Sequence, residues 1–297
     1  MSAPTSTAHS PGAFTISKDS RQPANYIIES AKRNARKEES YEQGEYRFES
    51  IWDHIISSQC DHAEDDDDGA QKCKICLFGR ELSLLPHHPE LLFPDNELII
   101  RWKNHPNAQI SFTALEALKM VSTSKLPDFQ VASAATWQEA RKGLEEFREY
   151  EKPFDWTYTT EYAGTLKEVH ESETEDAIDM ETLKRQDPIL FYAQNVLYED
   201  ELHDHGMAQY SARIRVMPTC FFVLVRFYLR VDHVHVRVCD TRVFGRTHET
   251  SIIREWSLRE AKMETLKHLD NDVINDPNQI WTHLPIVKEH TAKLAPL

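Results

Sequence analysis

The chain has 297 residues, of which 40% are hydrophobic, enough for a sizeable core in one large domain or two small ones. Its 49 acidic and 34 basic residues give a formal charge of -15, which argues against nucleic acid or an anionic membrane as the main partner. No apolar run reaches the roughly 18 residues that span a bilayer, and no apolar signal core is evident, so we expect a soluble cytoplasmic protein.

The beginning of the chain predicts a tail. Residues 1–22 are small and polar with two prolines, and we expect them to be disordered. Residues 25–43 are rich in charge and predict a helix with little apolar face. We therefore divide the chain into a disordered or partly helical tail, 1–43, and a single domain, 44–297.

The next segment contains the first predicted strand and a possible metal motif. Tyr46, Phe48 and Trp52 predict a strand over 46–52, and the acidic run 64–68 predicts a solvated loop. Cys73 and Cys76 have the C-x-x-C spacing of half a zinc knuckle, and further ligands could come from Cys60, His62, His87 and His88. Because no second C-x-x-C exists, we favour free cysteines, and five cysteines without framework spacing predict no structural disulfide.

Two helices and three strands are predicted in the middle of the chain. Strands are expected at 97–102, 129–132 and 156–162, a helix should begin at the capping residue Ser111, and a second helix should begin at Thr136. The aromatic residues of this region are interpreted as core residues rather than interface anchors: Trp137, Trp156, Tyr158 and Tyr162.

A strongly patterned block follows. Residues 167–180 predict an exposed excursion, 181–186 a short helix and 196–198 a strand. Apolar residues alternate with polar ones over 209–216, which predicts a strand with one wet face. The run 219–230 predicts a strand covered on both faces, followed by a hairpin turn at Asp232-His233 and another strand. A histidine at positive φ in that turn would be strained.

The last part of the chain predicts a strand at 251–256, a helix over about 258–268 and short helices near 280–281 and 286–287. The expected fold class is therefore α+β, with a mainly antiparallel sheet, in one or two layers, flanked by helices from the segments near 111, 136 and 258.

Two histidines in the acidic turn before the patterned strands suggest an alternative with a metal. His203 and His205 would point the same way on a strand, close to Glu199, Glu201 and Asp204. The alternative function is therefore a metal-dependent enzyme with a β scaffold that uses His203 and His205. The simpler interpretation is a polar turn in which Gly206 adopts the unusual backbone angle. Nucleotide-binding loops and a nucleophile elbow are absent from the sequence.

Six arginines lie on or at the ends of three consecutive predicted strands: Arg213, Arg215, Arg226, Arg230, Arg237 and Arg242. The simplest explanation is cross-strand pairing with acids, each pair contributing less than about 1 kcal/mol. The alternative is that some of them bind a carboxylate-bearing peptide, such as the C-terminal tail of a partner.

Several blocks in the same order resemble one known family. They include the segments 155–164, 199–206, 215–218, 226–232 and 240–242, and the resemblance covers about the last two-thirds of the chain. The family is the TIP-forty-one-like, or TIPRL, family of TOR-signalling-pathway regulators. The sequence departs from its pattern at Pro94 and His233, where the family usually has glycine, and over 60–80.

The resemblance implies a non-catalytic regulator, without a cofactor, that binds the catalytic subunit of type 2A protein phosphatases in nutrient signalling. An alpha-4-like phosphatase-associated protein is a second candidate partner. The residues expected at the contact are Ile189, Val238, Asp240 and Arg242, and the turn from Glu201 to Gly206, including Asp204, is a second candidate surface.

Overall fold

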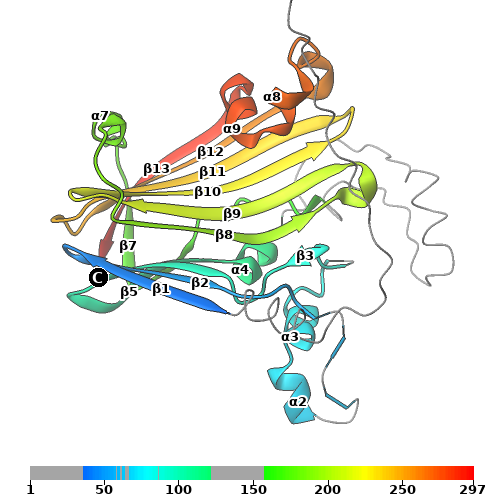
Figure 1. Ribbon diagram of the computed structural model, residues 1–297, viewed down its shortest axis with the longest axis horizontal. Helices are drawn as coiled ribbons and strands as arrows, with labels where there is room; N and C mark the ends of the chain where they lie inside the picture. The colour runs from blue at the N-terminus through cyan, green and yellow to red at the C-terminus, as the bar shows by residue number, and fades with distance from the viewer. Residues whose placement is uncertain (1–35, 58, 61, 64–66, 86, 122–156) are drawn as a thin grey trace, which may run out of the picture. The chain divides into compact units, whose positions relative to one another are not determined.

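Two antiparallel β-sheets lie face to face in the computed structural model (Figure 1). The structure describes residues 36–57, 59–60, 62–63, 67–85, 87–121 and 157–297, and all the elements below belong to the compact unit 36–297. The predicted disordered tail, the strand at 129–132, the helix from Thr136, Trp137 and Trp156 lie outside the described residues.

The larger sheet has eight strands, and each pair of neighbours is antiparallel. Its order is β3 (Leu91–Leu92), β8 (Phe191–Asp200), β9 (Gly206–Val216), β10 (Cys220–Val231), β11 (His235–Arg246), β12 (Ile252–Lys262), β13 (Ile286–Pro296) and β7 (Val169–Glu173). Strands β8 to β12 follow one another as a meander, which the alternating pattern of 209–216 and the apolar run 219–230 predict.

The smaller sheet has five strands in the order β1 (Lys37–Gln43), β2 (Tyr46–Trp52), β4 (Glu97–Trp102), β5 (His105–Thr113) and β6 (Thr165–Lys167). Strands β2 and β4 agree with the predicted strands at 46–52 and 97–102. The predicted α+β class with a mainly antiparallel sheet is confirmed, and the sheet forms two layers.

The inner faces of the two sheets bury a common core that is rich in aromatic rings. Phe221 of the large sheet packs edge-on against Tyr46 and Phe48 of the small sheet, with ring centroids 4.9 Å apart in both pairs. Tyr158 and Tyr162 are buried in this core, as the sequence predicts, and they accept hydrogen bonds at their carbonyl oxygens from Tyr198 and Tyr210. Tyrosine hydroxyls therefore tie the segment 158–162 to the large sheet.

Short helices flank the sheets. They are α2 (Asp67–Lys72), α3 (Lys74–Glu81), α4 (Ala114–Lys119), α7 (Met180–Lys184), α8 (Asn271–Asn275) and α9 (Pro277–Ile280), with 3-10 turns η1 (Leu202–Asp204), η2 (Met263–Thr265) and η3 (Trp281–His283). Helices α8 and α9 cover part of the outer face of the large sheet, whereas α2 and α3 project from the side of the small sheet (Figure 1). Within the described residues, no helix has the length and apolarity that crossing a bilayer requires.

Three predicted helices are strands, because neighbouring backbones supply their hydrogen bonds. Residues 37–43 form the edge strand β1, paired along its length with β2. Residues 258–262 continue β12, which has partners on both sides, and the segment near 286–287 begins β13. The charged side chains that resemble the solvated face of a helix lie instead on the solvent-exposed face of these strands.

Other predicted elements differ from the observed ones in their boundaries or regularity. Ser111 lies inside β5, and Thr113 caps the helix instead by accepting from the backbone N–H of Glu116 at 3.4 Å. The predicted strand at 156–162 is irregular where it is described, with one isolated bridge between Thr160 and Val121. The excursion 167–180 contains β7, while the short helix predicted at 181–186 is α7.

The hairpin between β10 and β11 turns at Asp232 and His233, as the sequence predicts. His233 has φ of 63° and an exposed side chain. In this left-handed conformation a Cβ atom lies too close to the following carbonyl oxygen, whereas glycine has no Cβ atom and is not strained.

We expect His233→Gly to raise the free energy of unfolding by about 0.5–1 kcal/mol, because the strain outweighs the extra backbone entropy of glycine in the unfolded chain. Urea denaturation of the wild type, His233→Gly and His233→Ala measures this. The alanine variant keeps a Cβ atom and should show no gain, so equal stabilisation by both substitutions would contradict the explanation.

Candidate partner-binding surface

A buried ion pair organises the outer face of the large sheet. Arg226 on β10 lies directly opposite Asp240 on β11, and its Nε and Nη2 atoms donate to the two carboxylate oxygens of Asp240, each at 2.7 Å. The side chain of Asp240 is fully buried and that of Arg226 is 7% exposed. A bidentate geometry of this kind compensates part of the cost of removing both charges from water.

The same guanidinium holds the start of α9 against the sheet. Arg226 Nη1 donates to the carbonyl oxygen of Pro277 at 2.8 Å and to Oδ1 of Asn278 at 3.1 Å. Oδ1 of Asn278 also accepts from Nη2 of Arg213 at 2.9 Å. The buried pair thus helps to hold Asn278, which also donates to Asp276, against the sheet, and Asn278 orients Arg213.

The six arginines of the strands fall into two groups. Four of them pair with acids. The pairs of Arg226 with Asp240 and of Arg237 with Glu260 are cross-strand, as the simpler interpretation predicts, whereas Arg242 and Arg230 pair with Asp240 and Asp232 two residues away along the chain. Arg213 and Arg215 on β9 form no ion pair with any acidic residue in the described ranges. These two guanidinium groups keep positive charge available at the surface.

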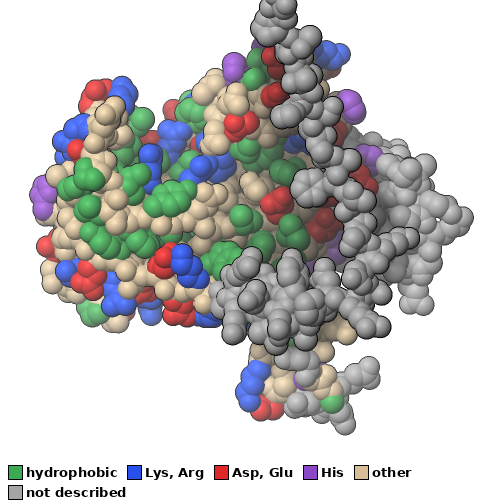
Figure 2. Space-filling view, viewed as in Figure 1, with side chains coloured by type: hydrophobic (Ala, Val, Ile, Leu, Met, Phe, Trp, Pro, Cys, Tyr) green, Lys and Arg blue, Asp and Glu red, His purple; other side chains and the backbone are tan. Residues whose placement is uncertain are grey.

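Arg213 and Arg215 line a shallow groove with a volume of about 340 Å³, which we name the arginine groove. Arg215 pairs across the sheet with Tyr192 on β8 and with Phe222 on β10. Arg213, two residues earlier on β9, pairs with Leu224 on β10. The lining residues are Tyr192, Arg213, Ile214, Arg215, Phe222, Leu224 and Asn278. Figure 2 shows this face, where hydrophobic and basic side chains gather between the projection of α7 and that of α8 and α9.

Exposed apolar side chains lie beside the groove at the beginning of β8. Ile189, Leu190 and Tyr192 are 53%, 40% and 50% exposed, respectively. The backbone N–H of Leu190 donates to the carbonyl oxygen of Val216 at 2.8 Å, which fixes this segment against the end of β9. The groove and its rim therefore combine positive charge with apolar area, a combination that is typical of protein-binding sites.

Two of the predicted contact residues are structural instead. Val238 is fully buried in a cluster with Tyr228, Ile274 and Ile280, beneath α8 and α9. Asp240, which the sequence predicts at the contact, lies inside β11 and is the fully buried partner of Arg226. Both side chains are buried beneath the surface and are not accessible to a partner.

The other predicted residues of the first surface are accessible. Ile189 lies at the rim of the groove. Arg242 stacks on the ring of Trp281, with its Cζ atom 4.4 Å from the ring centroid, and Arg259 stacks on the same ring at 4.2 Å. Partner contact by Ile189 and Arg242 stays a prediction.

The second predicted surface lies at the other end of β8. Glu201 and Asp204 are exposed, and the ten residues of β8 separate them from Ile189 by roughly 30 Å. Because this distance is far larger than one side chain, the two predicted surfaces cannot form a single small contact. Binding by Glu201 and Asp204 likewise stays a prediction.

The two histidines of the acidic turn do not lie on a strand. Leu202, His203 and Asp204 have φ of 51°, 57° and 66° and form η1, so the parallel arrangement expected for His203 and His205 is wrong. In the ranges that the structure describes, neither histidine belongs to a group of side chains that could hold a metal ion. No observation here favours the alternative of a metal-dependent enzyme.

The turn contains one buried carboxyl group. Asp200 accepts from the backbone N–H groups of Leu202 at 2.7 Å and Glu90 at 3.0 Å. Burial nevertheless dominates and raises the pKa of Asp200 to about 7, because the low-dielectric surroundings disfavour the charged carboxylate.

Several groove residues were not predicted from the sequence. Tyr192, Leu224 and Asn278 carry no motif, and Asn278 is 65 residues from Arg213 along the chain. Arg213 and Arg215 were recognised as members of a set of six, but sequence could not show which arginines lack an acidic partner. For Arg226 and Arg237 that distinction depends on the register of β10 to β12.

The two-layered antiparallel fold defines a β-sheet protein with a groove on the outer face of its larger sheet. The model of the TIP41-like family matches residues 91–267. The chain is 46% identical over 271 residues to a TIP41-like protein of Caenorhabditis elegans, which covers 91% of this chain and 95% of the relative. It is 41% identical over 214 residues to the human TIP41-like protein, covering 71% and 78% of the two chains. The chain belongs to the TIP41-like family.

A further relative carries a functional name. Over 180 residues the chain is 34% identical to the "Type 2A phosphatase activator tip41" of Schizosaccharomyces pombe, which covers 60% of this chain and 71% of the relative. The family resemblance expected from the sequence blocks is thus confirmed.

We expect Asp240→Asn to lower the free energy of unfolding by about 3–5 kcal/mol, because it leaves the guanidinium of Arg226 buried without a counter-charge. Urea denaturation measures the loss. The matched control is Asp232→Asn, which removes the acid from the more exposed pair with Arg230 and should cost less than about 1 kcal/mol. Equal losses in the two variants would show that the buried pair does not organise this face.

The buried carboxyl group of Asp200 predicts a pH dependence of stability. Its folded pKa lies above the ordinary value of about 4, so the folded state binds the extra proton and loses stability as the pH rises from about 4 to about 7. We expect Asp200→Asn to remove this decline, which amounts to at most about 4 kcal/mol.

The measurement is chemical denaturation of the wild type and Asp200→Asn at several pH values from 4 to 8. The difference between the two free energies of unfolding should increase in favour of the variant across this interval. Glu201→Gln, which alters an exposed carboxyl group of the same turn, is the control. A difference that is independent of pH would contradict a raised pKa at Asp200.

Proposed function

We propose that this chain is a non-catalytic regulatory protein that binds the catalytic subunit of a type 2A-like protein phosphatase through the arginine groove. The observation that carries the proposal is the pair of guanidinium groups on β9, Arg213 and Arg215, without acidic partners in the described residues and next to exposed apolar side chains. Membership of the TIP41-like family, which includes a relative named as a type 2A phosphatase activator, supports the choice of partner.

The chemistry of the groove suits a carboxylate-bearing segment. A guanidinium group donates two parallel hydrogen bonds to a carboxylate, and two such groups lie two residues apart on one face of β9. The chain as a whole has a formal charge of -15, so a negatively charged segment would be repelled by most of its surface and attracted here. A phosphatase segment that ends in a carboxylate or contains acids meets this requirement.

The apolar rim supplies the rest of the binding energy. Tyr192 and Ile189 present large apolar side chains that lose exposed area when a partner covers them. Aromatic and arginine side chains are the types most often found where binding energy is concentrated. A groove of about 340 Å³ accommodates one or two partner side chains, so the contact must extend over the rim to reach useful affinity.

The proposal also includes the cellular setting. The family resemblance implies action in TOR nutrient signalling, with an alpha-4-like phosphatase-associated protein as a second partner. The proposed location is the cytoplasm, where cysteines do not form structural disulfides.

Binding to purified type 2A-like catalytic subunits tests the proposal. We expect Arg213→Glu combined with Arg215→Glu to weaken binding by at least about 100-fold, because two attractive charges become repulsive. Wild-type affinity should also fall as the salt concentration rises. Biolayer interferometry at several salt concentrations measures both effects.

The control variant combines Lys167→Glu with Lys267→Glu, which reverses two exposed charges on β6 and beyond η2. It changes the net charge by the same amount and should bind almost as well as the wild type. Circular dichroism checks that all variants are folded. Absence of binding to every catalytic subunit offered, or wild-type affinity in the arginine double variant, would refute the proposal.

A further inference from the structure

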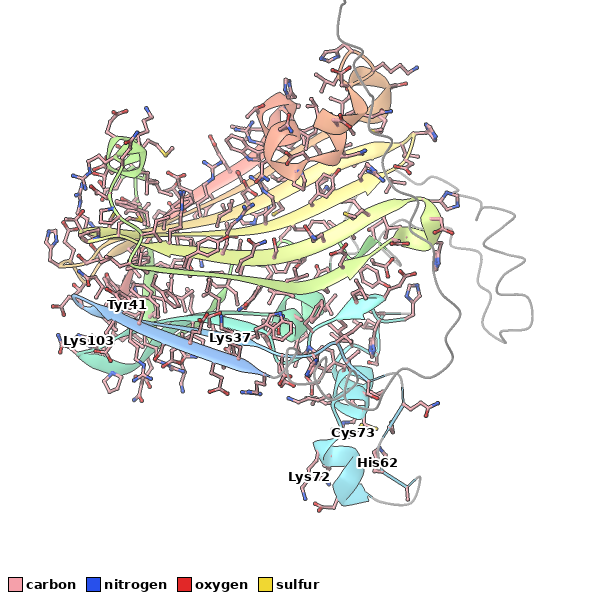
Figure 3. The ribbon with its side chains drawn as sticks, viewed as in Figure 1. Lys37, Tyr41, His62, Lys72, Cys73 and Lys103 are labelled. Atoms are coloured by element: carbon pink, nitrogen blue, oxygen red, sulfur yellow. The ribbon has the colours of Figure 1, made fainter. Side chains whose placement is uncertain are left out.

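Four potential metal ligands from two separate segments converge beside α2 and α3. Cys60 and His62 come from the connection between β2 and α2, and Cys73 and Cys76 come from the beginning of α3. One ligand atom of each residue lies within 4.8 Å of the corresponding atoms of the other three. Figure 3 shows Cys73 and His62 close together at this projection.

The separations fit a tetrahedral site. Zinc lies about 2.3 Å from thiolate sulfur and about 2.0–2.1 Å from imidazole nitrogen, so a tetrahedral arrangement places two sulfurs about 3.8 Å apart and sulfur and nitrogen about 3.5 Å apart. The Sγ atoms of Cys60 and Cys76 are 3.7 Å apart, and Nε2 of His62 is 3.1 Å from Sγ of Cys76. The sulfur pair matches directly, and the imidazole needs to move by only a few tenths of an ångström.

The surroundings of the ligands suit a metal. The Nδ1 atom of His62 lies 2.8 Å from the carbonyl oxygen of Ala63, which favours the tautomer with a proton on Nδ1 and a lone pair on Nε2, the atom that faces the cysteines.

The other histidines considered from the sequence lie outside the cluster. His87 has its Nδ1 atom 2.6 Å from the hydroxyl of Tyr158, and His88 packs edge-on against the ring of Phe78. The donor set is therefore three cysteines and one histidine. This closed set of soft ligands is typical of structural zinc, whereas magnesium and calcium prefer oxygen.

The projection that carries the cluster has little core of its own. None of residues 68–72 of α2 is buried, and Phe78 is the buried residue of α3. Helices of six and eight residues are unstable in isolation, so such a segment benefits from a cross-link that supplies folding energy. The cysteines would supply it as thiolates, each releasing a proton on binding.

We propose that Cys60, His62, Cys73 and Cys76 bind one zinc ion, which fixes α2 and α3 to the connection that follows β2. The ion has a structural role, because all four positions of the tetrahedron are filled by protein ligands. The site precedes residues 91–267, which match the family model, and lies on the opposite side of the two sheets from α8 and α9 (Figure 1). Zinc binding is thus independent of the arginine groove.

The test begins with the wild-type full-length chain, purified with a reducing agent and supplied with zinc. We expect about one zinc ion per chain by elemental analysis after exhaustive dialysis. Removal by a chelator should increase the number of thiols that react rapidly with a disulfide reagent and lower the unfolding temperature. Cobalt added to the stripped protein should give the intense visible absorption of a tetrahedral, thiolate-bound ion.

Variants then assign the ligands. Cys76→Ser and His62→Ala should each retain less than about a tenth of an equivalent of zinc after dialysis, whereas His54→Ala, an exposed histidine of the same connection, should retain a full equivalent. The chelator and cobalt measurements on the wild type need no variant, so they decide the matter even if a variant fails to fold. Any of three results would overturn the proposal: a wild-type chain without zinc, a Cys60–Cys76 disulfide in the reduced preparation, or a full equivalent of zinc in Cys76→Ser and His62→Ala.

Discussion

The outer face of the large sheet depends on one buried ion pair. Arg226 and Asp240 lie on the two central strands, and removing them from water is tolerated because their hydrogen bonds are bidentate and a third donor is used by Pro277. The pair thus joins strand register to the docking of α9. Without it, Asn278 would keep its hydrogen bonds to Asp276 but would be held less firmly against the sheet, where it orients Arg213 toward the groove.

The arginines of the large sheet are of two kinds, those that pair with an acid and those that do not. Where a strand neighbour supplies an acid, the guanidinium group is neutralised and becomes part of the scaffold, as at Arg237 beside Glu260. On β9 the cross-strand neighbours of Arg213 and Arg215 are Gln194, Leu224, Tyr192 and Phe222, none of which is acidic. The same sheet therefore contains both structural arginines and arginines that remain available to an external anion.

Sequence predicted the parts of the fold in which side-chain pattern and backbone pairing agree. The alternation over 209–216, the apolar run over 219–230 and the hairpin at His233 correspond to β9, β10 and their neighbour β11. It failed where long-range pairing overrides a charged, helix-like pattern, as in β1 and β13. The site was predictable in composition, through its arginines and Ile189, but the burial of Val238 and Asp240 depends on α8 and α9, which no local pattern reveals.

The ends of the two sheets have a further consequence for the behaviour of the chain at high concentration. The outermost strands are β3 with two residues, β6 with three, β7 with five and β1, which carries Glu38, Glu39 and Glu42. A short border strand offers few free amide and carbonyl groups to a second molecule, and the acidic side chains of β1 repel a second copy of the same strand. These borders thereby limit edge-to-edge self-association of a sheet whose inner strands, β8 to β13, each have 10 to 12 residues.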